Sequence, residues 1–135
     1  MGYSIEEIEG IGKVYGDKLR AAGVKDTDAL LAACGRPKDR AALAAATGIP
    51  EALVLKFANR ADLMRVKGVG EEYADLLEAA GVDTVPELAQ RKAENLHAAL
   101  EATNAAKKLV RQAPSLKAVQ GWIAAAKELP RALHY

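Results

Sequence analysis

The chain has 135 residues, of which half are apolar and only 4% aromatic, and its net charge is +1 at pH 7. This length can bury a sizeable core, and the near-neutral charge excludes a strong bulk attraction to nucleic acid or to a membrane surface. Its single cysteine excludes an intramolecular disulfide and favours a reducing compartment, and no apolar run approaches the length of a membrane span. Because the first residues also lack the pattern of a signal peptide, we expect a cytoplasmic protein.

Helical spacing of apolar residues predicts an all-α first half, with no run that alternates over the length of a strand. Ser4 with Glu7 fits a capping box, Asp26 and Asp62 fit N-caps, and Pro37 and Pro50 suit first helical positions. In the helix that follows Gly12, the apolar residues at helical spacing are Val14, Tyr15, Leu19 and Ala22. The expected helices cover residues 5–9, the run after Gly12 to about 22, 27–34, 37–46, 50–59 and 63–66.

A shift of 58 residues lays residues 8–31 on residues 66–89 with ten identities in twenty-four pairs. The identities include both glycines of Gly10-Ile11-Gly12 and of Gly68-Val69-Gly70, and Thr84 with Glu87 adds a second expected capping box. Agreement of glycines, caps and core positions indicates a tandem duplication. We therefore expect a first repeat at residues 1–63 and a second at 64–135, packed into one globule.

The second repeat continues with helices around Leu88, Leu96 and Leu100. Thr103-Asn104 stands where the first repeat has the turn Thr47-Gly48, which makes residues 105–112 an insertion. Pro114-Ser115 opens a last helix, in which Ile123 is the expected counterpart of Phe57. The apolar residues of this helix at helical spacing are Leu116, Val119, Trp122, Ile123 and Ala126.

The Gly-aliphatic-Gly runs are the first candidate sites. Glycine tolerates a positive φ and a close backbone approach, so each run suits a tight connection between two helices. The backbone N–H groups in the first turn of the helix after Gly12 have no partner within the helix, so they could bind an anion. A purely architectural role, in which the glycines simply join two helices steeply, is the competing interpretation.

Gly-aliphatic-Gly between two short helices resembles the helix-hairpin-helix motif of bacterial DNA ligases, repair nucleases, DNA-uptake proteins and RNA polymerase subunits. Thr47-Gly48-Ile49-Pro50 resembles a degenerate second hairpin. Nearly the whole chain resembles a bacterial family of small stand-alone proteins of unknown function in the order of its motifs. These motifs are Gly-Ile-Gly, Tyr15, the Ala-Ala-Gly-Val that ends at Val24, Gly-Val-Gly, Tyr73 and Trp122-Ile123. The resemblance implies an all-α, SAM-like or DNA-ligase-like fold of tandem repeats, and it implies no settled activity.

In nucleic-acid-binding relatives, amides around the second glycine meet a phosphate, and a basic or small residue comes next. The matching residues are Gly10, Ile11, Gly12 and Lys13, with Lys18 and Arg20 adding charge on the same helix, whereas the bulky Val14 and Tyr15 depart from the pattern. Gly68 and Gly70 match, but the acids after them would repel phosphate. These acids are Glu71, Glu72, Asp75 and Glu78.

A basic cluster in the insertion and at the start of the last helix is the second candidate site. Lys107, Lys108, Arg111 and Lys117 have no acid between them and could follow a phosphate backbone, or simply form a solvated surface. No spacing of His or Cys suits a metal, and no nucleophile or phosphate-loop motif is present, so we expect no cofactor and no catalysis. We favour a non-catalytic module that binds a DNA or RNA backbone weakly and without sequence preference, through the first hairpin at Gly10 to Lys13 with help from the surface between Lys107 and Lys117. The alternative is a protein-interaction adaptor with purely architectural hairpins.

Overall fold

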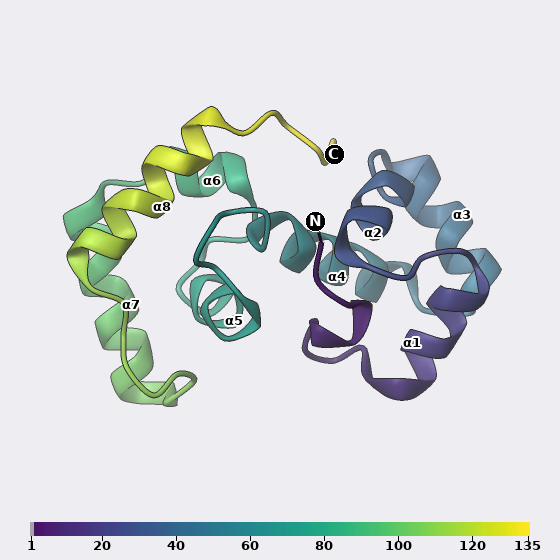
Figure 1. Ribbon diagram of the computed structural model, residues 1–135, viewed down its shortest axis with the longest axis horizontal. Coiled ribbons are helices and arrows are strands. Elements are labelled where there is room, and N and C mark those ends of the chain that lie inside the picture. The colour runs from purple at the N-terminus through teal and green to yellow at the C-terminus, as the bar shows by residue number, and fades with distance from the viewer. Residues whose placement is uncertain (1) are drawn as a thin grey trace. The chain divides into compact units, whose positions relative to one another are not determined.

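A computed structural model describes residues 2–135, which form helices and turns with no strand (Figure 1). The all-α prediction is therefore confirmed for this part of the chain. An isolated antiparallel bridge joins Ser4 and Asp26 without extending into a strand. The elements in chain order are the 3₁₀ helix η1 (Ile5–Glu7) and the α-helices α1 (Gly12–Ala21), α2 (Thr27–Ala33), α3 (Pro37–Thr47), α4 (Glu51–Leu63), α5 (Glu71–Ala79), α6 (Val85–Ala89), α7 (Ala93–Lys107) and α8 (Leu116–Glu128).

The described chain divides into two compact units. The first unit consists of residues 2–62 together with 131–135, and the second unit consists of residues 63–130. The division after Asp62 falls within one residue of the seam expected from the repeat, whereas residues 131–135 belong to the first unit and not to the second. The second unit is therefore inserted in sequence between two parts of the first.

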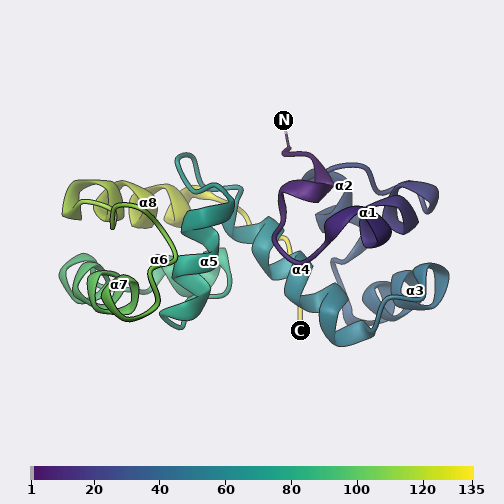
Figure 2. The ribbon, with the colours of Figure 1, turned by 90° about the horizontal axis from the view of Figure 1, so that it is seen from below.

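The first unit is built from η1 and the helices α1 to α4. η1 packs against α1 (Figure 2), and α3 contacts both α1 and α2. Ser4 and Glu7 form the expected capping box, although the helix that they open is one turn of 3₁₀ helix. The Asp26 carboxylate accepts a hydrogen bond of 2.8 Å from the amide of Ala29, which confirms Asp26 as the cap of α2.

The second unit places α8 against α6 and α7 (Figure 1). Its core contains Leu88, Leu96 and Leu100, which are all fully buried. The Arg65 guanidinium donates two hydrogen bonds to the carbonyl oxygen of Pro130, at 2.8 and 2.6 Å. These bonds join residues close to the two ends of the unit.

Two expected features near helix ends are wrong. Asp62 does not cap a new helix, because α4 continues through it to Leu63 and Asp62 is buried. The Thr84 hydroxyl donates to the Glu87 carboxylate at 3.2 Å and accepts no bond from the backbone, so this capping box does not form. Val14 is 68% exposed, although its spacing in α1 favours the inner face.

The turn expected at Thr103-Asn104 is also absent, because α7 continues to Lys107. Lys108 ends α7 in the left-handed conformation, with φ of 52°, and its amide donates to the carbonyl oxygen of Asn104 at 2.7 Å. In the first unit, Gly48 ends α3 in the same conformation, with φ of 75°. The counterpart of Gly48 is therefore Lys108, and the added residues lie partly within α7.

Candidate nucleic-acid interface

The first hairpin, residues 8–12, is a tight turn held by two buried aliphatic side chains. The amide of Ile11 donates to the carbonyl oxygen of Ile8 at 3.3 Å, and both side chains are buried. Gly10 has φ of 93°, which L-residues with a side chain rarely adopt. The aliphatic residue between the glycines thus anchors the turn and leaves its backbone at the surface.

The second hairpin, residues 66–70, repeats this turn. The amide of Val69 donates to the carbonyl oxygen of Val66 at 3.0 Å, and both valines are fully buried. Gly68 has φ of 92°, within one degree of Gly10. The correspondence that the sequence shift predicts therefore extends to backbone geometry at this turn.

An aromatic side chain covers the first glycine of each hairpin. A Cβ on Gly10 would lie 3.4 Å from Phe57, and a Cβ on Gly68 would lie 3.2 Å from the indole nitrogen of Trp122. The ring centroids of Tyr15 and Phe57 lie 6.2 Å apart and those of Tyr73 and Trp122 lie 5.1 Å apart, and the two pairs are tilted by 57° and 54°. Trp122 is thus the counterpart of Phe57, and the expected pairing of Phe57 with Ile123 is wrong by one residue.

The second glycine of each hairpin is where the two turns differ. Gly12 has φ of 62° and is the first residue of α1, whereas Gly70 has φ of −94° and is the extended N-cap of α5. Nothing lies within 4 Å of a Cβ built on either glycine, and Gly12 is exposed whereas Gly70 is half-buried. The first turn of α1 contains no acid, whereas Glu71 and Glu72 stand in the first turn of α5. These two carboxylates already complement the positive end of the α5 dipole and oppose a second anion there.

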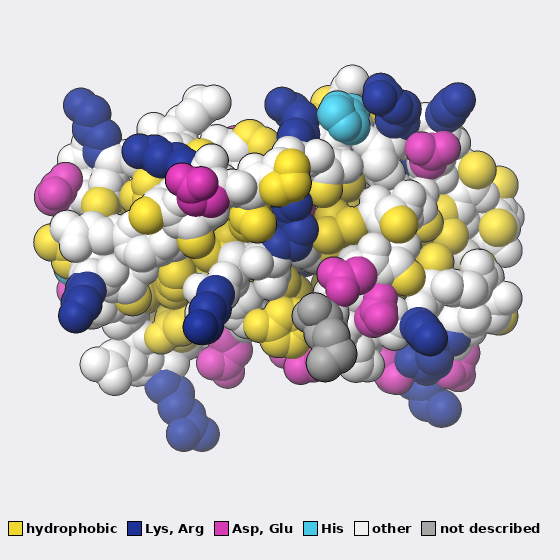
Figure 3. Space-filling view, turned by 45° about the horizontal axis from the view of Figure 1, so that its top comes forward, with side chains coloured by type: hydrophobic (Ala, Val, Ile, Leu, Met, Phe, Trp, Pro, Cys, Tyr) yellow, Lys and Arg dark blue, Asp and Glu magenta, His cyan; other side chains and the backbone are white. Residues whose placement is uncertain are grey.

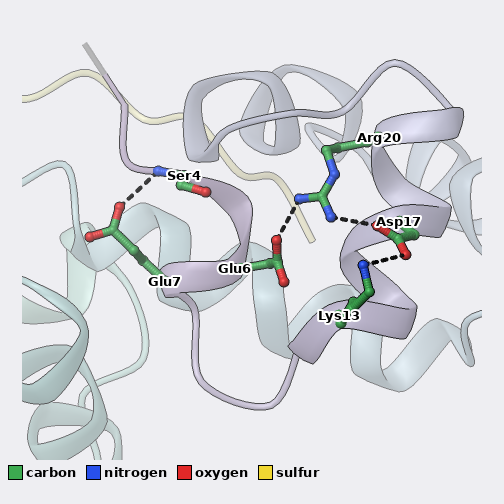
Figure 4. Close-up of polar contacts among 6 residues, drawn as sticks. All are labelled: Ser4, Glu6, Glu7, Lys13, Asp17 and Arg20. Carbon is green, nitrogen blue, oxygen red and sulfur yellow. Dashed lines mark hydrogen bonds and ion pairs between the residues drawn. The ribbon is translucent and has the colours of Figure 1, made fainter.

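Acids neutralise most of the basic charge beside the first hairpin (Figure 4). Arg20 donates to Glu6 at 2.8 Å and to Asp17 at 2.7 Å, and Lys13 lies 3.7 Å from Asp17. The hydrogen bond from Arg20 is the main reason that the pKa of Asp17 is lowered, and the same bond raises the pKa of Arg20. Lys18 is exposed. A phosphate at this hairpin would have to compete with carboxylates for Lys13 and Arg20.

The α7–α8 junction, which we define as residues 107–117, presents its basic side chains differently. Lys107, Lys108, Arg111 and Lys117 are all exposed, and none has an ion pair among residues 2–135. The first turn of α8 carries no acid. Four positive charges therefore face solvent without an acidic neighbour to neutralise them.

The junction is anchored to the unit beneath it. The amide of Val110 donates to the side-chain oxygen of Asn104 at 2.9 Å, and Val110 is buried. The Tyr73 hydroxyl donates to the carbonyl oxygen of Gln112 at 3.4 Å, and the Ser115 hydroxyl accepts from the amide of Ala118 at 3.1 Å. These bonds fix the backbone between the basic side chains, so little backbone entropy would be lost on binding.

The structure distributes the predicted site residues over both units. Gly10, Ile11, Gly12, Lys13 and Lys18 lie in the first unit, and Gly68, Gly70, Lys107, Lys108 and Arg111 lie in the second. On the face shown in Figure 3, Lys and Arg side chains stand singly or beside Asp and Glu. Sequence reasoning missed the role of Glu6 as a partner of Arg20, because fourteen residues separate them and no local spacing indicates the contact.

Groups suited to catalysis are few in the described chain. Among residues 2–135, no group of three or more His, Cys, Asp or Glu side chains could hold a metal ion. Cys34 is fully buried, and desolvation raises the pKa of its thiol to about 11, so the nucleophilic thiolate is scarce at neutral pH. His97 lies 3.7 Å from Glu101 on the same helix, one turn away.

No single helix in residues 2–135 is both long and apolar enough to cross a membrane. Helices α3 and α4 reach the required length and composition only when taken together, and the chain bends by 116° between them.

The described chain is thus all-helical, and a tight turn with the same φ at its first glycine occurs twice in it. Residues 9–129 match the family described as "Domain of unknown function (DUF4332)", and the chain belongs to this family. No curated protein and no solved structure matches the chain.

Proposed function

We propose that this protein is a non-catalytic module that binds the phosphate backbone of nucleic acid without reading its sequence. We assign this binding to the α7–α8 junction of the second unit, and a separate, weaker binding to the first hairpin of the first unit. The four unpaired cations of the junction carry the proposal, because contacts with phosphates supply most of the affinity of such proteins. Because these exposed lysines and this arginine have no acidic partner, no ion pair has to break when they bind a phosphate.

The first hairpin contributes in a weaker way. Gly12 is open to solvent, the first turn of α1 carries no acid, and Lys18 is exposed. The amides at the start of this helix are therefore available to an anion. Since Lys13 and Arg20 already contact carboxylates, we expect this hairpin to add less affinity than the junction.

The proposal includes the finer description of the fold. We infer that the two units are tandem helix-hairpin-helix repeats, supported by the matching φ of Gly10 and Gly68 and by the aromatic residue that covers each. A bacterial source and a cytoplasmic location follow from the same resemblance and from the single cysteine, and they are part of this proposal.

Fluorescence anisotropy tests the proposal with labelled single-stranded and double-stranded DNA and RNA of unrelated sequences at about 50 and 200 mM salt. We expect affinity to fall steeply with salt and to depend little on sequence. The double variant Lys107→Glu, Lys108→Glu should weaken binding by roughly tenfold or more at low salt and flatten the salt dependence. Lys13→Glu should have a smaller effect.

The matched control is Lys127→Glu, which changes the same charge at an exposed position near the other end of α8. It should weaken binding much less than the double variant. The absence of binding at micromolar protein and low salt would contradict the proposal. An equal loss in the control and in the double variant would show that only net charge matters, and would remove the junction as the site.

A protein-interaction adaptor is the second candidate, and the exposure of Val14 favours it. This valine is 68% exposed in the first turn of α1, where a phosphate contact would suit a small or basic residue better. The acidic start of α5 could dock a basic partner in the same way. Affinity capture with the wild-type chain should then recover a defined partner, and the loss of that partner on Val14→Ser or on Glu71→Lys, Glu72→Lys would assign the surface.

A further inference from the structure

Residues 131–135 lie on the first unit as an extended segment, although the whole second unit precedes them in sequence. The Leu133 side chain is buried, with 2% of its surface exposed. The amide of His134 donates to the carbonyl oxygen of Gly35 in the α2–α3 turn at 2.7 Å. The Arg131 guanidinium donates to the carbonyl oxygen of Leu133 at 2.9 Å and holds the segment in shape. One apolar anchor and one backbone bond therefore fix its centre.

Tyr135 provides the second attachment. Its hydroxyl donates to the side-chain oxygen of Asn59 in α4 at 2.6 Å, and its ring lies 5.3 Å from the guanidinium of Arg40 in α3. Arg40 is itself buried and donates to the carbonyl oxygen of Cys34 at 2.9 Å, so the cation that faces the ring is held in place by the unit. The tyrosine nevertheless remains 60% exposed.

We propose that this surface of the first unit, formed by Gly35, Arg40 and Asn59, is a docking site for an extended segment with a leucine and a tyrosine two positions apart. Residues 131–135 of the same chain occupy the site in the structure, and the occupant that we assign in trans is the same segment of a second copy. Leu133, the His134 amide and Tyr135 supply the contacts of the segment with this surface. A chain whose segment has left the site offers both a vacant site and a free segment, so two copies can exchange segments.

The balance between the two forms depends on concentration. A tethered segment experiences an effective concentration near the millimolar range, so the intramolecular contact dominates in dilute solution. A separate peptide of the same sequence must compete with that tethered segment. It should therefore bind the wild-type chain roughly tenfold or more weakly than a chain whose own segment has been weakened.

The experiment uses a fluorescently labelled peptide with the sequence of residues 130–135 and the full-length chain. In the variant Leu133→Ala, Tyr135→Ala the segment loses its apolar anchor and its hydroxyl, which leaves the site open. We expect this variant to bind the peptide roughly tenfold or more tightly than the wild type. Adding Asn59→Ala to the variant should weaken peptide binding by about fivefold or more, whereas adding Gln120→Ala at an exposed position of α8 should not. A peptide carrying Leu133→Ala should bind poorly to every chain.

A folded double variant, as judged by circular dichroism, that fails to bind the peptide would overturn the proposal, and so would equal binding by the wild type. If the double variant does not fold, unlabelled peptide is titrated into the wild-type chain and followed by amide resonances. Selective shifts at Gly35, Arg40 and Asn59 then support the site. Unchanged resonances of these three residues at millimolar peptide overturn it.

Discussion

The first and second hairpins share one turn and differ in the helix that begins after it. Gly10 and Gly68 have the same φ to within one degree, and each lies beside an aromatic ring that is in tilted contact with a tyrosine. The next helix begins without an acid after Gly12 and with two acids after Gly70. The shared turn rests on buried aliphatic and aromatic side chains, whereas the acids that distinguish the second hairpin are half-buried at Glu71 and exposed at Glu72. Packing therefore fixes the turn in both units, while the surface chemistry of each is free to differ.

Removing the aromatic residue beneath each hairpin should have the largest effect on stability. Trp122→Ala and Phe57→Ala each delete a buried ring and should lower the free energy of unfolding by roughly 3–5 kcal/mol. Chemical denaturation followed by circular dichroism measures both variants. The equivalence of the two rings also predicts that Trp122→Phe costs much less than Trp122→Ala. If Trp122→Phe is as damaging as Trp122→Ala, the two rings do not play the same role.

Adding a methyl group to the first glycine of each hairpin should reveal a difference in fit. Gly10→Ala and Gly68→Ala both place a side chain at positive φ, which costs about 1–2 kcal/mol. Gly68→Ala should cost roughly 1 kcal/mol more, because its Cβ would lie 3.2 Å from Trp122, against 3.4 Å from Phe57 for Gly10. Thermal or chemical unfolding of the two variants gives this difference. Equal costs would mean that the Trp122 ring moves away freely.

Alkaline pH should weaken the first unit through Cys34. Because the thiol has a pKa of about 11 when folded and about 9 when unfolded, the unfolded state loses its proton first as the pH rises. Stability is therefore unaffected below about pH 9 and falls between about pH 9 and 11, by at most roughly 2–3 kcal/mol. Denaturation of the wild type and of Cys34→Ala at about pH 8 and about pH 10.5 isolates this contribution from those of other groups. Parallel losses in the two proteins would exclude the thiol as the cause.

The residues that end α3 and α7 allow a test by reciprocal substitution, for which we expect the smallest change in stability. Lys108 is the non-glycine residue with positive φ within residues 2–135, and Gly48 is its counterpart in the first unit. Lys108→Gly should stabilise the protein by roughly 1 kcal/mol, and Gly48→Lys should destabilise it by a similar amount. Equilibrium unfolding measures both. A Lys108→Gly variant that gains no stability would show that the lysine side chain makes a compensating contact.

Local signals predicted the features that depend on a few neighbouring residues. The capping box of Ser4 and Glu7, the Asp26 cap and the start of α3 at Pro37 involve residues within one helical turn of each other, and the structure contains all three. Asp62 has the composition of a cap but lies inside α4, since the burial of its neighbours extends the helix past it. Tertiary packing overrode the local preference at that point.

The candidate sites could be predicted only where their residues lie close together in the sequence. The basic residues of the junction could be found because they lie within eleven positions of one another, from Lys107 to Lys117. Lys108 as a helix end could not, because the pairing of Thr103-Asn104 with Thr47-Gly48 assumed helices of equal length. Two contacts join residues that lie far apart in the chain, and only the fold brings these residues together. They are the ion pair of Arg20 with Glu6 and the hydrogen bond from Tyr135 to Asn59.

The return of residues 131–135 to the first unit has a consequence for the order of folding. The bond between Tyr135 and Asn59 closes a loop of 76 residues, which contains the entire second unit. Closing so long a loop costs chain entropy, and the few contacts of the segment can offset this cost only after the surface that they bind has formed. We therefore expect the helices of the first unit to form around Leu19, Leu30 and Val54 before the segment arrives. The segment would then act as a latch that closes on a nearly completed unit, and amide exchange at His134 during refolding would show protection after that of the α4 amides.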